Sequence, residues 1–204
     1  MAWSSYNSSG AAKTNRSPTF VTTLPTGSDG QEVYYQADSS KGVIWHLRYR
    51  GTAAGGSATY PWEFVGGPAM FNGDTGYTGT DGYVSGATFL RAASGGKALP
   101  SLTVPLAGQY HVRLSSNALT LSAATDGYIS FTQGASGSSS TDDGLQLRNS
   151  AATTTVVPIL TSTYKVLTAA ALYLEARATA GNSLYLTGAS NGRLELAITP
   201  IRVG

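Results

Sequence analysis

Cysteine is absent from the 204 residues of this chain. Its absence excludes disulfide bridges, thiolate nucleophiles and sulfur-ligated metal sites, and it fits assembly in a reducing cytoplasm. Histidine is almost as scarce, with two residues, His46 and His111. The sequence therefore holds little of the material from which most hydrolytic active sites are built.

Charge is in short supply too. Charged residues make up 12% of the chain, about half of the ~25% that is usual in soluble proteins. The formal net charge is +2, and the basic residues form no cluster larger than the separated pair Arg48 and Arg50. Surfaces that bind DNA or RNA need such a cluster, so we expect no nucleic-acid partner.

Long hydrophobic runs are missing as well. The longest, near residues 156–160 and 169–174, are far shorter than the ~20 residues that cross a bilayer. The first residues, MAWSSYNSSGAAKTNRS, lack the apolar stretch of a secretory signal. We therefore expect no membrane insertion, and lysis or particle release is a simpler route out of a cell than secretion.

The main pattern in the sequence is the alternation of apolar and polar residues that is typical of β-strands. Hydrophobic residues make up 41% of the chain, enough apolar area for a folded core. Between residues 30 and 67, apolar side chains alternate with polar ones in three short runs, which is the period of a strand with one buried face. This pattern predicts a small antiparallel meander, with Trp45 and Trp62 packing together beneath it.

The C-terminal part shows the same alternation in many short runs separated by Gly, Asn and Ser. In the segment AALYLEARAT a helix competes by composition, but its period of two favours a strand. Many short strands in roughly 115 residues are typical of a two-sheet sandwich or jelly roll. The predicted strands are residues 88–92, 102–106, 109–115, 118–122, 127–132, 145–149, 154–160, 164–167, 170–179, 184–187 and 194–203.

Composition divides the chain into four parts. Residues 1–23 are rich in Ser, Asn, Gly and Thr with scattered aromatic rings, and they read as an N-terminal attachment arm, ordered by a partner or disordered alone. Residues 24–71 form the small three-stranded module. Five glycines in residues 72–86 predict a linker, and residues 87–204 form the sandwich. The predicted fold class is all-β.

Candidate chemistry is sparse. His46 and His111 each fall on the polar face of a predicted strand, which favours exposed or cross-strand roles over a catalytic base. Asp142 and Asp143 are the only adjacent acids, and they could hold a calcium ion with loop carbonyls, although Asp before Gly is also ordinary turn chemistry. The same two readings apply to Asp74 and Asp81. We assign no catalytic, cofactor or metal residues.

The strings DGQEVYY, GVIWHLRYR and WEFVGG resemble a small module of virion structural proteins of tailed bacteriophages. Those proteins are described as minor tail, tail-fibre or head-associated components. The resemblance covers about a quarter of the chain and brings no catalytic residues. It implies a location on the virion after assembly in the host cytoplasm, and a role in building or decorating the particle, with head or tail left open.

A second resemblance involves Pro105, Gly108, Tyr110 and Val112 in VPLAGQYHV. This run is similar to the trimeric jelly rolls of the tumour-necrosis-factor and complement type, and it implies a homotrimer. The strands also carry more apolar positions than one internal core needs, which favours a subunit interface. A thicker core in a monomer is the alternative.

Together these features predict a non-enzymatic structural protein of a phage particle. It would dock onto capsid or tail proteins by its N-terminal part and project a trimeric jelly roll, with host contact as a further role. Recognition of host cell-surface glycans is an alternative, because exposed aromatic rings stack on sugars. A cell-wall-degrading enzyme is less favoured.

Overall fold

The structure is a computed structural model that describes residues 18–77, 83–93, 95–121, 126–138, 144–148, 155–179, 183–186 and 192–204. It is all-β, as predicted. The only helical element in the described ranges is one 3₁₀ turn, Thr52–Ala54. The chain folds as two compact units: unit 1 is the part up to Pro68 together with Arg202–Gly204, and unit 2 is Ala69–Ile201.

Unit 1 contains the predicted meander, in which β2, β3 and β4 pair in antiparallel order. Two further strands extend it. Strand β1 pairs with β2 in parallel, and the last residues of β14 pair with β4. Strand β1 occupies part of the predicted attachment arm, whose residues 1–17 lie outside the described ranges. The strands are β1 (Thr19–Val21), β2 (Glu32–Asp38), β3 (Val43–Tyr49), β4 (Trp62–Gly66) and β14 (Gly192–Val203).

The core of unit 1 is aromatic. Trp45 and Trp62 are both buried, as the alternation predicted. Each packs with other rings: Trp45 with Tyr35 and Phe64, and Trp62 with Tyr49 in an edge-to-face contact at 5.3 Å. The indole N–H of Trp45 donates to the Pro68 carbonyl at 3.0 Å, so burial leaves this polar group satisfied.

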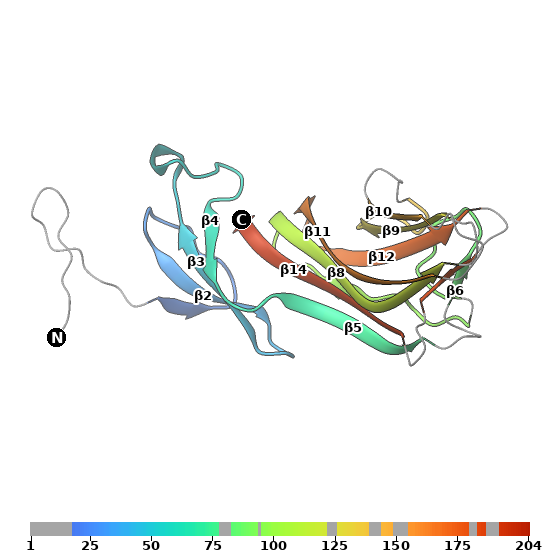
Figure 1. The fold of residues 1–204 in the computed structure, drawn as a ribbon. Coiled ribbons are helices and arrows are strands. Elements are labelled where there is room, and N and C mark those ends of the chain that lie inside the picture. Colours follow the sequence, from blue (N-terminus) through green and yellow to red (C-terminus); the bar gives the residue numbers. More distant parts are fainter. Residues whose placement is uncertain are drawn as a thin grey trace, which may run out of the picture. The chain divides into compact units, whose positions relative to one another are not determined.

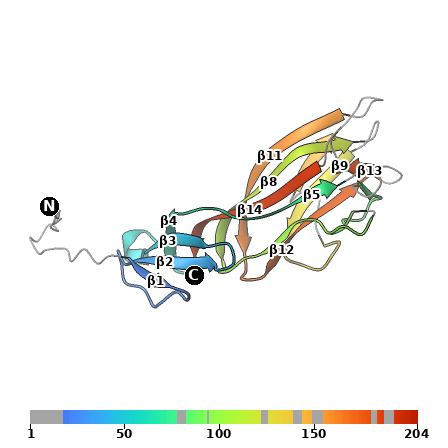
Figure 2. The same cartoon turned by 90° about the horizontal axis from the view of Figure 1, so that it is seen from below.

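Unit 2 consists of two sheets that face each other (Figure 1). One has the order β5-β14-β8-β11 (Figure 2), with β13 also beside β8 and β6 beside β13. The other has the order β10-β9-β12-β7. The strands are β5 (Met70–Tyr77), β6 (Tyr83–Ser85), β7 (Ser101–Thr103), β8 (Gly108–Leu121), β9 (Asp126–Thr132), β10 (Gly144–Arg148), β11 (Thr155–Leu167), β12 (Ala171–Ala178), β13 (Ser183–Tyr185) and β14.

The strand order is that of a jelly roll. If the short strands β6 and β13 are set aside, eight strands remain, and numbered along the chain they lie as 1-8-3-6 in one sheet and 2-7-4-5 in the other. The chain thus crosses between sheets as two interlocked Greek keys do. The alternating side chains fill the space between the sheets, where Tyr110, Val112 and Leu114 of β8 and Leu194, Leu196 and Ile198 of β14 are all fully buried.

Several element boundaries differ from the sequence-based expectation. The predicted linker, residues 72–86, contains most of β5 and all of β6, because the β5 backbone pairs with β14 whatever its side chains. Strands β8 and β11 are each continuous where two short strands were predicted, because the two pair with each other along almost their whole length and the pairing runs through both apparent breaks. Their mutual register shifts between Val157 and Ile159, around Pro158, which has no N–H to donate. Of residues 88–92, Leu90 and Ala92 form only isolated bridges.

Candidate interaction surfaces

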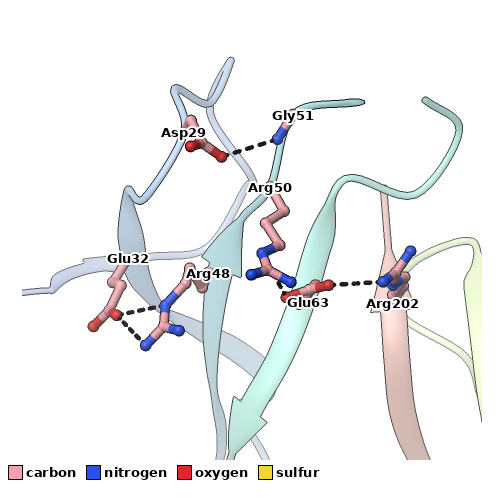
Figure 3. Close-up of polar contacts among 7 residues, drawn as sticks. All are labelled: Asp29, Glu32, Arg48, Arg50, Gly51, Glu63 and Arg202. Carbon is pink, nitrogen blue, oxygen red and sulfur yellow. Dashed lines mark hydrogen bonds and ion pairs between the residues drawn. The ribbon is translucent and has the colours of Figure 1, made fainter. Parts of the chain in front are cut away.

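The outer face of the unit 1 sheet carries a row of alternating charges, which we call the charge ladder (Figure 3). It consists of Glu32 on β2, Arg48 on β3, Glu63 on β4 and Arg202 on β14, each in register with the next. Glu32 and Arg48 are 2.8 Å apart, and so are Glu63 and Arg202. Arg50 lies 3.6 Å from Glu63. The ladder has no net charge.

Neighbouring hydrogen bonds and charges shift the pKa of the Glu32 carboxyl. Partial burial raises the pKa of its carboxyl, but the hydrogen bonds and charges of Arg48 and His46 lower it by more, and the net pKa lies below its ordinary value of 4.5. His46 Nε2 lies 3.0 Å from Glu32 Oε2. The carboxylate of Glu32 is therefore the favoured form in the folded chain.

An apolar row lies beside the charge ladder on the same face. Phe20, Tyr34, His46 and Gly66 are aligned across β1 to β4. Phe20 and Tyr34 are 53% and 40% exposed, and the Tyr34 and His46 rings are 5.0 Å apart. Ile44 and Val65 on this face are also exposed. Such a group of apolar side chains marks a candidate contact surface.

Unit 2 leaves the outer face of one sheet uncovered. On the β5-β14-β8-β11 sheet, Tyr164 and Val166 of β11 are 51% and 56% exposed, and Phe71 of β5 is 47% exposed. Charged side chains lie between these strands: Glu195 of β14 is 2.8 Å from Arg193 and 3.4 Å from Arg113. The face thus combines exposed apolar side chains at both sides with paired charges at its centre.

The outer face of the other sheet is covered by the chain itself around Glu175. Glu175 of β12 points outward but is fully buried, because Arg91 and the loop after β9 lie over it. Arg91 Nε donates to Glu175 Oε1 at 2.7 Å, and the guanidinium lies 3.8 Å from the Tyr173 ring centroid. The backbone N–H of Gly137 also donates to Glu175 at 3.3 Å. Arg91 and Glu175 thus pin two segments onto this face.

The structure places the sequence-predicted candidates as follows. His46 makes a cross-strand contact with Glu32, and His111 is exposed on the same face of β8 as Arg113, so both lie where their polar strand faces predicted. Asp81, Asp142 and Asp143 lie outside the described residues, and for Asp74 only the backbone, in β5, is described. Within the described ranges, no three His, Asp or Glu side chains gather where they could hold a metal ion.

Sequence reasoning missed the charge ladder and the role of Glu175. The ladder's members fall on polar phases of their strands, but only the register brings Arg202 beside Glu63. In the alternation along β12, Glu175 falls on the side that is expected to be exposed. The segments that bury it have no sequence pattern that predicts their contact with Glu175.

A comparison with known protein families found no family model that matches the chain, and a search of curated proteins found no match. Among the elements that the structure describes, no helix is long and apolar enough to cross a bilayer.

Proposed function

We propose that the chain is a non-enzymatic structural component of a tailed-phage particle, either a tail-fibre or minor tail protein or a head decoration. In this role unit 1 and the preceding residues dock onto capsid or tail proteins. The jelly roll of unit 2 projects outward as a trimer and is free to contact the host. The module resemblance in unit 1 and the eight-strand order of unit 2 support this role together.

The proposal of a trimer rests on the contrast between the two outer faces of unit 2. One sheet is covered by the chain's own segments around Glu175, which is fully buried. The other leaves Tyr164, Val166 and Phe71 about half exposed. Covering exposed apolar side chains on one sheet face with a symmetric copy lowers the free energy, so we place the trimer contact on the β5-β14-β8-β11 sheet.

Glycan recognition remains the alternative function. Two of the three tryptophans, Trp45 and Trp62, are in the core of unit 1 and are not available to stack on a sugar. The rings of Phe20 and Tyr34 are exposed side by side, and they are the observation that would favour this function.

The direct test is the composition of purified particles. Antibodies against the chain, applied to density-purified phage and viewed by electron microscopy, should label the same part of every particle, either the tail or the head. Mass spectrometry of the same particles should detect the chain in a copy number divisible by three. Particles that are free of the chain after purification would refute the proposal, and a chain that degrades cell-wall polymers would indicate the enzymatic alternative.

A further inference from the structure

The charge ladder of unit 1 is complementary to itself. From β2 to β14 its signs are negative, positive, negative, positive, and read in the opposite direction the order is reversed. We propose that the outer face of unit 1 pairs with the same face of a second copy of this chain, around a two-fold axis parallel to the strands. This contact goes beyond the proposed function and is separate from the trimer contact of unit 2.

The alternating order of charges selects one arrangement. An axis that passes between β3 and β4 sets Arg48 opposite Glu63 of the partner subunit, and Glu32 opposite Arg202 of the partner subunit. An axis perpendicular to the strands would instead set each charge opposite its own kind, and like charges opposed in a contact that excludes water strongly disfavour that arrangement. A contact of this kind is isologous, so every ion pair occurs twice.

The apolar row fits the same arrangement. Phe20 and Tyr34 make its β1–β2 end bulky, while Gly66 at the β4 end carries no side chain. Rotation about the two-fold axis lays the bulky end of one row over the β4–β14 side of the other. Ile44 and Val65, which are 37% and 43% exposed, would lose their contact with water as the faces close.

The electrostatics favour a second copy over other partners. Each charge in the ladder already has an opposite charge beside it in the same copy, so closing the face buries no unpaired ion. A nucleic acid or an anionic membrane would need an excess of positive charge here. The four charges of the ladder cancel, and Arg50 beside it is paired with Glu63. The exposed rings suit a sugar as well, and glycan binding is therefore one outcome of the test.

The test uses the full chain with Tyr164→Glu, which removes the proposed trimer contact of unit 2. In this background we expect sedimentation of a concentration-dependent dimer, and adding Ile44→Glu should leave a single copy. A Tyr164→Glu chain that remains a single copy at all concentrations would overturn the inference, and so would tight binding of cell-wall glycans that Tyr34→Ala abolishes. If Tyr164→Glu leaves the mass of the assembly in solution unchanged, the trimer proposal fails. The effect of Ile44→Glu on that mass still tests the two-fold contact of unit 1.

A charge swap tests the register. Arg48→Glu and Glu63→Arg, each in the Tyr164→Glu background, set like charges opposite each other and should each weaken pairing at least ~100-fold. In a mixed dimer of the two variants, the introduced glutamate faces the introduced arginine, and the symmetric position keeps the original pair. Mixing should therefore restore dimers with an affinity within about tenfold of the unswapped chain. Tryptophan fluorescence must show that both variants fold. A mixture that stays monomeric while both fold would contradict the two-fold register.

Discussion

Gly67 shows how one residue position constrains unit 1. It follows β4 with φ of +131°, and a Cβ placed there would come 2.5 Å from the Ile44 carbonyl oxygen. The preceding Gly66 has no atom within 4 Å of such a Cβ. The two adjacent glycines of WEFVGG therefore differ in what they tolerate, which the sequence string alone does not reveal.

Gly67→Ala should destabilise unit 1 by about 1–3 kcal/mol, because alanine resists this φ and its Cβ meets backbone. Gly66→Ala, the matched control, should change stability by less than about 1 kcal/mol. The three tryptophans of the chain all precede Pro68, so urea unfolding followed by tryptophan fluorescence reports on unit 1. Equal midpoints for the two variants would show that the backbone at Gly67 relaxes freely.

Glu32 should make the stability of unit 1 depend on pH. Its pKa is lower in the folded chain than its ordinary value of 4.5, so its contribution is fully present above that value and is lost as pH falls through the folded pKa. The difference in urea midpoint between the parent chain and Glu32→Gln should be largest near neutral pH and should disappear in acid. A difference that stays constant with pH would exclude this linkage.

At the scale of elements, the pair Arg91 and Glu175 ties irregular segments to β12. Glu175 is fully buried and Arg91 is partly buried, so truncating one partner leaves an unpaired charge inside the protein. Leu90 and Ala176 add two backbone hydrogen bonds to the same attachment. The alternation of side chains predicted a regular strand near Leu90. In the structure, side-chain contacts rather than a continuous row of backbone hydrogen bonds hold much of this segment in place.

Arg91→Ala should destabilise unit 2 by about 3 kcal/mol, because it leaves the Glu175 carboxylate buried without its partner. The double variant Arg91→Met with Glu175→Met should lose less, since it removes both charges. Arg113→Ala, which breaks the exposed pair with Glu195, is the control and should cost less than ~1 kcal/mol. Circular dichroism in urea measures all three, and hydrogen exchange should rise selectively in residues 86–93 for Arg91→Ala.

Individual elements show why prediction from sequence succeeded in part. The period of two identified β12 correctly although its composition favours a helix, because one face of that strand is buried between the sheets. Strand β5 was missed because glycines hide its pattern and pairing with β14 supplies its order. The ladder was missed because it depends on register between strands far apart in sequence, which a single sequence does not encode locally.

For the whole molecule, the exposed face of the β5-β14-β8-β11 sheet leads to a prediction about mass. In an Ile44→Glu background, which removes the proposed unit 1 contact, we expect a trimer of about 63 kDa, three times the chain mass of 21.0 kDa. Adding Tyr164→Glu should yield single copies, because a charge on this face cannot be buried unpaired, whereas Tyr164→Phe should keep the trimer. Light scattering after size exclusion distinguishes these masses, and a monomer in the Ile44→Glu background would refute the trimer.

The sheet of unit 1 takes strands from both sides of unit 2 in the sequence, since Arg202 and Val203 pair with β4. Unit 2 is therefore an insertion into unit 1. On a ribosome that delivers the chain from its N-terminus, β14 emerges after β1 to β13, and the part of β14 that completes the jelly roll precedes Arg202 and Val203, which pair with β4. Of the two units, unit 1 therefore closes second, and a chain released before residue 202 would leave the edge of β4 unpaired.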